Sequence, residues 1–207
     1  HNQLTQLDLS NNPILNRLHC YNNSLTSLDV SNNTALIDMN CQDNQLTSLD
    51  VSSNTALTVL VCSSNQLTSL DVSSNTALTS LYCGYNQLTS LDISSNTALK
   101  QFYCQENQIT SLDVSSNTAL TDLSCAVNQI TSLDVSSNTA LGLLWCQSNQ
   151  LTYLNMKNGV TDQLTNFNAT DNSLTCIEVN ADDVAYATAN WSNIDAGVTF
   201  SESCAVQ

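Results

Sequence analysis

The stretch TSLDVSSNTAL at residues 47–57 decides the fold, because the chain repeats it almost unchanged. Each copy is followed by ten residues that vary, such as TVLVCSSNQL at 58–67. A fixed period of 21 residues predicts a solenoid in which each repeat forms one coil. Identical copies of the stretch also occupy 68–78, 110–120 and 131–141, and copies with one substitution occupy 26–36 and 89–99.

Each period contains two similar arms. The pattern L-x-x-L-x-[CV]-x-x-N occurs at 57–65, in what we call the variable arm, and again at 67–75, in the constant arm. In both arms, apolar residues alternate with polar ones, as in a half-buried strand. We therefore predict a mainly β solenoid of short parallel strands, with about eight coils and few or no helices in them. At about 4.8 Å per coil, it would be a rod on the order of 40 Å long.

One cysteine column and two asparagine columns follow the same period. We expect each Asn to turn inward where an arm bends, so that its amide bonds backbone groups left unpaired there. We expect the thiols to be buried as small apolar side chains, because a row of parallel thiols cannot converge on a metal ion. The columns are Cys20, Cys41, Cys62, Cys83, Cys104, Cys125 and Cys146; Asn23, Asn44, Asn65, Asn86, Asn107, Asn128 and Asn149; and Asn12, Asn33, Asn54, Asn75, Asn96, Asn117 and Asn138.

The motif L-x-x-L-x-C-x-x-N-x-L at 57–67 resembles the leucine-rich repeat, with Cys where that family usually has Leu. The 21-residue period with a cysteine ladder is similar to the internalin-J-like subtype of bacterial surface proteins. The resemblance covers roughly residues 4–158. It implies a bacterial binding module that is secreted or displayed at the cell surface.

The repeat breaks near the end of the chain. Leu164 and Phe167 repeat the positions of Leu141 and Leu144 with an offset of 23 residues rather than 21. We predict a solenoid over 1–158, followed by a last irregular coil and a C-terminal cap over 159–207 in the same structural domain. The tail resembles those of secreted leucine-rich-repeat proteins of Bacteroidetes. Its expected plug consists of Tyr186, Trp191, Ile194 and Phe200.

Two cysteines, Cys176 and Cys204, lie outside the cysteine column. Since the resemblance implies export to an oxidising compartment, and since they are the one pair out of register, we predict a disulfide between them.

The constant arm carries a row of aspartates that point outward. Neighbours would lie about 5 Å apart, so that each adjacent pair costs on the order of 0.8 kcal/mol in water before salt screening. Cations such as Ca²⁺ could occupy the row, or each carboxylate could bond Ser or Thr hydroxyls and backbone amides nearby. We favour local bonding. The row consists of Asp8, Asp29, Asp50, Asp71, Asp92, Asp113 and Asp134, of which all but the first are candidate calcium ligands.

The net charge of the chain is -15, from 18 acidic and three basic residues. This charge would repel nucleic acids and anionic membrane surfaces, and the apolar runs are too short to insert in a membrane. We expect no enzymatic activity and no cofactor, because the chain has two histidines, no glycine-rich phosphate loop and no nucleophile beside a base.

The outward positions of the variable arm carry most of the aromatic residues of the repeat region. Large rigid rings among amides are typical of binding surfaces. We therefore predict a monomeric recognition or adhesion module for a protein or a neutral glycan. The alternatives are a passive spacer in a larger surface protein and, more distantly, an ice-binding solenoid with regular threonine columns. The predicted ligand-binding residues are His19, Tyr21, Tyr82, Tyr85, Lys100, Tyr103 and Trp145.

Overall fold

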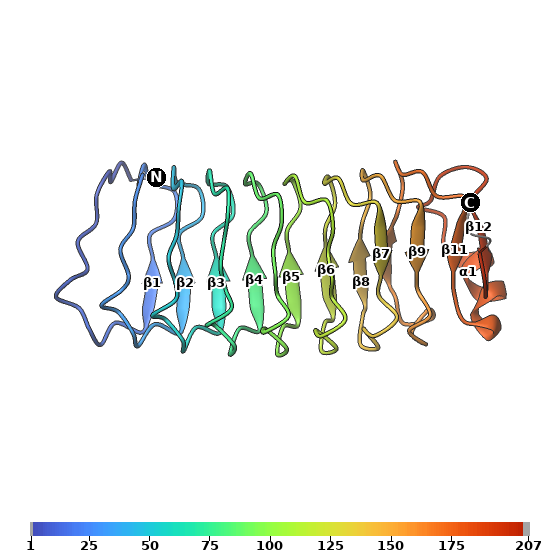
Figure 1. The fold of residues 1–207 in the computed structure, drawn as a ribbon, viewed down its shortest axis with the longest axis horizontal. Coiled ribbons are helices and arrows are strands. Elements are labelled where there is room, and N and C mark those ends of the chain that lie inside the picture. Colours follow the sequence, from blue (N-terminus) through green and yellow to red (C-terminus); the bar gives the residue numbers. More distant parts are fainter. Residues whose placement is uncertain (1, 205–207) are drawn as a thin grey trace.

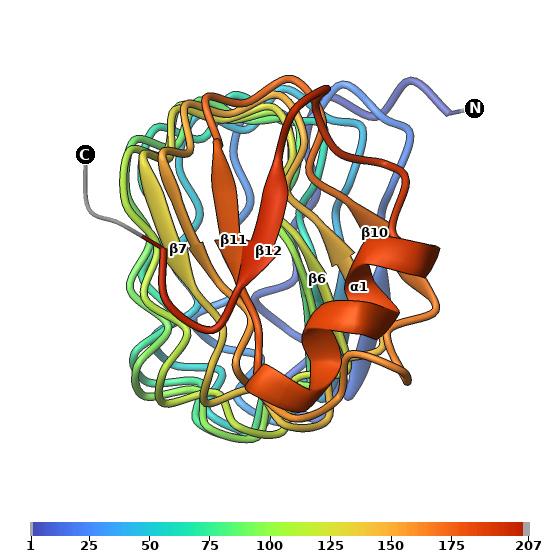
Figure 2. The ribbon, with the colours of Figure 1, turned by 90° about the vertical axis from the view of Figure 1, so that its right-hand side faces the viewer.

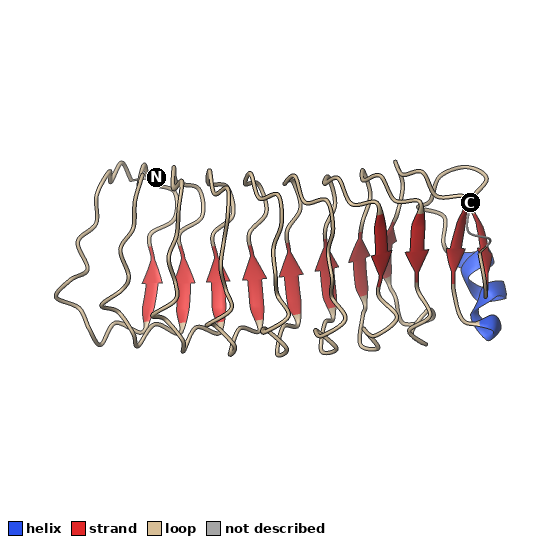
Figure 3. Cartoon of the chain, in the orientation of Figure 1, coloured by secondary structure: helices blue, strands red, loops and turns tan. Residues whose placement is uncertain are grey.

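The computed structural model describes residues 2–204, which form an elongated solenoid with its coils stacked along one axis (Figure 1). One strand from each variable arm joins an eight-stranded parallel sheet, which we call the front sheet (Figure 3). The predicted solenoid of short parallel strands is confirmed. In order, the strands are β1 (Arg17–His19), β2 (Asp38–Asn40), β3 (Val59–Val61), β4 (Ser80–Tyr82), β5 (Gln101–Tyr103), β6 (Asp122–Ser124), β8 (Leu143–Trp145) and β10 (Asn166–Asn168).

The 21-residue period sets the register of this sheet. The middle residue of each strand is buried and pairs with the middle residue of the next, as Leu60 does with Leu81. The last pair is Leu144 with Phe167, which confirms the offset of 23 residues. Identical letters of the repeat therefore form straight columns along the solenoid.

The constant arm forms regular strands only towards the C-terminus, although the sequence predicted strands in every coil. Those four strands are β7 (Ser132–Asp134), β9 (Tyr153–Asn155), β11 (Cys176–Glu178) and β12 (Thr199–Ser201), which make a second parallel sheet. In an earlier coil, within residues 66–72, one backbone bond reaches the preceding coil, from the Gln66 N–H to the Leu46 carbonyl at 2.8 Å. A single bond per coil is too few for a strand ladder.

The two asparagine columns bond the backbone groups at the bends of the coils in different ways. The Asn65 amide nitrogen donates to the carbonyls of Cys41, Cys62 and Ser63, and its oxygen accepts the Leu46 N–H at 3.0 Å. In the other column, the amide nitrogen of Asn75 donates to two carbonyls, but its buried oxygen has no hydrogen-bond partner. Both columns point inward, as predicted, except for Asn12 in the first coil, which is exposed.

The cysteine column lies in the interior, and its seven thiols are free. Burial raises the pKa of Cys20 to about 11, and the pKa of Cys83 and of Cys125 to about 12. The thiols therefore stay protonated at neutral pH and pack as small apolar groups.

The 3-10 helix η1 (Ala181–Asp183), the helix α1 (Val184–Asn190) and β12 cover the C-terminal end of the solenoid (Figure 2). The Trp191 ring packs between Phe167 and Phe200, with centroids 4.5 and 5.7 Å away. Ile194 and Phe200 are partly buried against the core. The expectation for Tyr186 was wrong: its side chain is 39% exposed, because α1 buries Ala187 instead.

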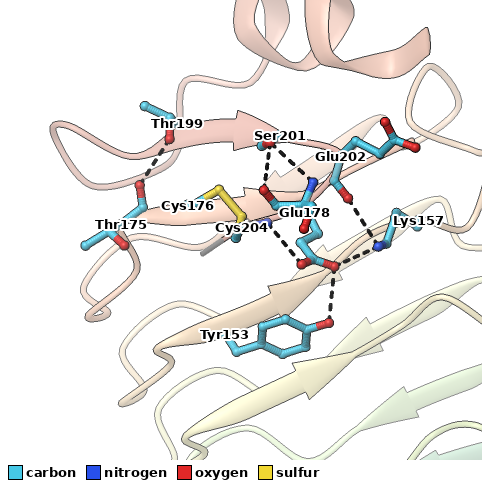
Figure 4. Close-up of a disulfide and its surroundings, with 10 residues drawn as sticks. Tyr153, Lys157, Thr175, Cys176, Glu178, Thr199, Ser201, Glu202 and Cys204 are labelled. Atoms are coloured by element: carbon cyan, nitrogen blue, oxygen red, sulfur yellow. Dashed lines mark hydrogen bonds and ion pairs between the residues drawn. A yellow bond between two sulfur atoms is a disulfide. The ribbon is translucent and has the colours of Figure 1, made fainter. Parts of the chain in front are cut away.

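Side-chain bonds tie this end together (Figure 4). Cys176 and Cys204 form a disulfide, the pair expected from the sequence. Beside it, Glu178 pairs with Lys157 at 2.8 Å and accepts the backbone N–H of Cys204 at 3.1 Å. The bond from Lys157 lowers the pKa of Glu178 below its ordinary value.

Candidate recognition surface

The first and third residues of each front-sheet strand point outward, because the middle residue is buried. We call the surface that these outward residues form the variable face. The strands stand side by side along the solenoid (Figure 1). Because successive strands pair in register, their outward side chains form two columns. The columns place residues that are 21 positions apart in the sequence next to each other.

The centre of the variable face holds a stacked pair of tyrosines. The ring centroids of Tyr82 and Tyr103 lie 4.9 Å apart, and the ring planes are inclined by 12°. The Tyr82 hydroxyl donates to Gln101 Oε1 at 2.8 Å, and the Ser80 hydroxyl donates to the same oxygen at 3.2 Å. These contacts hold the rings in place before any ligand arrives.

A carboxylate lies beside this pair. Asp122 is the first residue of β6 and pairs with Gln101 of β5. Its Oδ2 accepts a hydrogen bond from the Thr121 hydroxyl at 2.6 Å. Partial burial, and after it the charge of Asp122, raise the pKa of Tyr82 and of Tyr103, so both phenols are neutral at pH 7.

Trp145 continues the aromatic column towards the C-terminus. The register runs from Tyr103 to Ser124 and then to Trp145. Ser124, which stands between them in the column, is 1% exposed. The Trp145 indole N–H donates to Asn166 Oδ1 of β10 at 2.9 Å, which fixes the orientation of the ring.

The N-terminal part of the variable face is polar. His19 Nε2 lies 3.1 Å from Asp38 Oδ1, and Arg17 Nε lies 3.0 Å from Asp38 Oδ2. The charge of Asp38 is therefore compensated within the face. The His19 ring is also near Tyr21, with centroids 6.3 Å apart.

The structure places three of the predicted ligand-binding residues beside the strand columns rather than in them. Tyr21 follows β1, Lys100 precedes β5, and Tyr85 lies in the turn after β4. The Tyr85 backbone has a φ of 57°, and its side chain is 53% exposed at the edge of the variable face. His19, Tyr82, Tyr103 and Trp145 occupy the outward columns themselves.

Two further residues belong to this surface. Gln101 orders Tyr82, and Asp122 supplies the charge beside both rings. Both residues occupy outward positions of the repeat, and this was the one feature of the sequence that could have identified them as surface residues of the variable face. Their contacts depend on side-chain directions that the repeat pattern does not encode.

The aspartates of the constant arm lie on the opposite side of each coil. Each carboxylate accepts the backbone N–H of the residue two positions later, as Asp50 does from Ser52 at 2.9 Å. The hydroxyl and the N–H of that serine lower the pKa of Asp50. The row ends at Asp134, which accepts a bond from Asn155 at 3.2 Å. Within residues 2–204, no three His, Cys, Asp or Glu side chains converge as a metal site would need.

Comparison with known proteins gives leucine-rich-repeat matches over parts of the chain. A family model for two copies of leucine-rich repeats matches residues 76–117, and a model for a single leucine-rich repeat matches residues 21–36. A comparison with curated protein sequences finds no match.

Several solved structures are similar to this solenoid. The functional domain of internalin J from Listeria monocytogenes, which includes a cysteine ladder, is 30% identical over 86% of this chain, with a TM-score of 0.51. A leucine-rich-repeat protein of Leptospira interrogans is 22% identical over 97% of the chain, with a TM-score of 0.76. Internalin F from Listeria monocytogenes is 22% identical over 99%, with a TM-score of 0.70.

The chain spans little more than half the length of these structures, at 52%, 54% and 59% respectively. The two matches at 22% identity support the fold alone. The likeness to internalin J extends to the cysteine in each coil. Within residues 2–204, no helix is long and apolar enough to cross a membrane.

Proposed function

Because this chain is a solenoid of leucine-rich repeats with a cysteine ladder, we propose that it is a recognition module that binds a protein or a neutral glycan through the variable face. The module acts without catalysis. Its constant arm and interior hold the coils in register, and the outward positions of the variable arm carry the contacts to the ligand.

The stacked pair of Tyr82 and Tyr103 is the observation that carries this proposal. Large aromatic side chains lose little conformational entropy on binding and bury a large area. This pair is already ordered by Gln101, so binding would cost it still less. A passive spacer has no need of Tyr and Trp at the positions where its repeat varies.

We further propose that the module works outside the cell or at its surface. The disulfide between Cys176 and Cys204 is typical of an oxidising compartment. The likeness to internalin J supports the same location.

The test is an array of extracellular proteins and glycans, probed with the 207-residue chain. We expect the variant that combines Tyr103→Ala with Trp145→Ala to lose at least tenfold in affinity for the captured ligand. Tyr153→Ala is the matched control, because Tyr153 is a partly exposed aromatic on β9, which belongs to the second sheet and not to the variable face. Its affinity should stay within twofold of the parent.

Two results would contradict the proposal. If the double variant binds as well as the parent, the variable face is not the binding surface. If the unmodified chain binds no protein or glycan from the environment in which it is found, a passive spacer explains the chain better than a recognition module does.

A further inference from the structure

We propose that the centre of the variable face binds an arginine side chain of a protein partner, with the guanidinium on the aromatic surface and paired to Asp122. This inference rests on the proposed function and narrows its ligand from a protein or glycan to a protein segment that carries a positive charge.

The charge distribution of the front sheet is the first observation. Among the outward residues of β3, β4, β5, β6 and β8, Asp122 is the one charged side chain. The neighbouring positions carry Val, Ser, Tyr, Gln, Leu and Trp. A single carboxylate thus lies in the middle of a surface that is otherwise neutral and largely apolar.

No basic side chain within residues 2–204 forms an ion pair with this carboxylate. Arg17 pairs with Asp38, and Lys157 pairs with Glu178. The third basic residue, Lys100, forms no ion pair within residues 2–204, and neither does Asp122. A hydroxyl from Thr121 is the contact that Asp122 receives. A partner can therefore supply the opposite charge.

The aromatic surface beside Asp122 favours arginine over other cations. Asp122 pairs in register with Gln101, the residue that accepts the Tyr82 hydroxyl and lies two positions before Tyr103 on β5, so the carboxylate stands next to the stacked rings. A guanidinium stacks on aromatic faces and pairs with a carboxylate through two N–H bonds, whereas an ammonium offers a compact, strongly hydrated charge. A neutral sugar would stack on the rings but leave the carboxylate without a counter-charge.

The field of the whole chain supports the same ligand. A net charge of -15 attracts a cationic partner over distances longer than a contact and raises the rate of encounter. That field is common to every face of the molecule. The specific part of the interaction is the pairing of one carboxylate with an ordered aromatic surface.

The probes for the test are the peptide acetyl-Gly-Arg-Gly-amide and its citrulline counterpart, which has the same shape but no charge. The chain has two tryptophans, so an ¹⁵N spectrum contains two indole signals. Trp145 lies on the variable face, while Trp191 is buried at the C-terminal end and acts as an internal reference. We expect the arginine peptide to shift the Trp145 signal alone, with about tenfold higher affinity than the citrulline peptide.

Matched variants separate the local contribution of Asp122 to peptide binding from the contribution of the net negative charge. Asp122→Asn should weaken the arginine peptide about three- to fivefold, since it removes the charge and keeps an acceptor for Thr121. Asp113→Asn removes the same charge from the constant arm and should change the affinity less than twofold. Equal losses in the two variants would overturn the proposal, as would equal binding of the arginine and citrulline peptides.

Two further outcomes distinguish this inference from the proposed function. If cellotriose shifts the Trp145 signal and the arginine peptide does not, the ligand is a glycan and the arginine site is wrong. A second outcome is that neither the arginine peptide nor cellotriose binds, while the double variant of Tyr103 and Trp145 still loses affinity for the captured ligand. The proposed binding face is then supported, and the arginine site is wrong. A lysine peptide that binds as tightly as the arginine peptide would refute the choice of guanidinium.

Discussion

Tyr82 and Tyr103 lie one coil apart on the variable face and stack with their ring centroids 4.9 Å apart. Their separation is close to the spacing of neighbouring strands, so the stack follows directly from placing the same residue type at the same position of successive coils. The pair should stabilise the chain as well as serve binding. Its two roles can be measured separately.

A double-mutant cycle measures the stabilising role. We expect Tyr82→Ala and Tyr103→Ala together to show a coupling free energy of unfolding of about 0.5 to 1.5 kcal/mol in urea denaturation. A control cycle with Tyr82 and Tyr153, which belong to different sheets, should show a coupling near zero. Equal couplings in the two cycles would mean that the stack contributes nothing specific.

The two asparagine columns should differ in their contribution to stability. Asn65→Ala removes four hydrogen bonds, including the bond to the Leu46 N–H, and should lower the free energy of unfolding by about 3 to 5 kcal/mol. Asn75→Ala removes two bonds to carbonyls that also accept backbone N–H groups, and it eliminates an unpaired oxygen. Its loss should be about 1 to 3 kcal/mol. Chemical denaturation checks the order, and a larger loss for Asn75→Ala would contradict it.

The cysteines should separate into two classes. In the folded chain we expect a thiol reagent at pH 8 to react with none of them rapidly, because burial keeps the seven free thiols protonated. After unfolding without a reductant, seven thiols should react, and after unfolding with a reductant all nine should. A count of nine without a reductant would exclude the disulfide between Cys176 and Cys204. Loss of that bond should cost about 3 kcal/mol.

The aspartate row predicts the direction of the pH dependence in acid. Hydrogen bonds from Ser52 lower the folded-state pKa of Asp50 below its ordinary value of 3.8, and the equivalent serines lower the pKa of the neighbouring aspartates in the row. Their contribution is therefore present above about pH 4 and lost as the pH falls through the lowered folded-state pKa. We expect the melting temperature to fall between pH 4 and pH 2. A melting temperature that rises on acidification would show that repulsion along the row outweighs these bonds.

Calcium binding along the row stays a separate proposal with its own measurement. Each carboxylate already accepts a hydrogen bond from a nearby serine. We therefore expect CaCl₂ at about 5 mM to raise the melting temperature no more than NaCl of equal ionic strength does. This concentration is on the order of the dissociation constants of weak extracellular calcium sites. A rise specific to calcium that disappears in an Asp71→Asn and Asp92→Asn variant would assign the row to cations. Asp122→Asn is the control, since it lies on the other sheet.

The sequence predicted the parts of this structure that the period dictates. Residues 21 positions apart, such as Leu60 and Leu81, had to pair once each repeat closed one turn. Inward asparagines and buried cysteines followed from the need to pair polar groups and fill a thin interior. Those predictions required only the spacing.

Features that depend on local geometry were harder to predict. Tyr85 was grouped with the strand aromatics, but its positive φ places it in a turn. Tyr186 was assigned to the interior, but the direction of α1 leaves it exposed. The register places Asp122 beside Gln101, but the bond from the Tyr82 hydroxyl to Gln101 depends on side-chain directions across two coils. The period fixes which residues share a column, but it does not fix turn conformations or the directions of side chains.

The Asn65 contacts also have an evolutionary consequence. Each such residue bonds its own coil and the coil before it, and every internal coil offers the next one the same carbonyls. Removal of 68–88 would join Leu67 to Thr89 and leave the surviving coils with equivalent neighbours. Unequal crossing-over between the gene segments that encode these repeats can therefore lengthen or shorten the molecule by whole turns. Each such event adds or deletes one front-sheet strand with its outward residues, and the contacts in the interior stay the same.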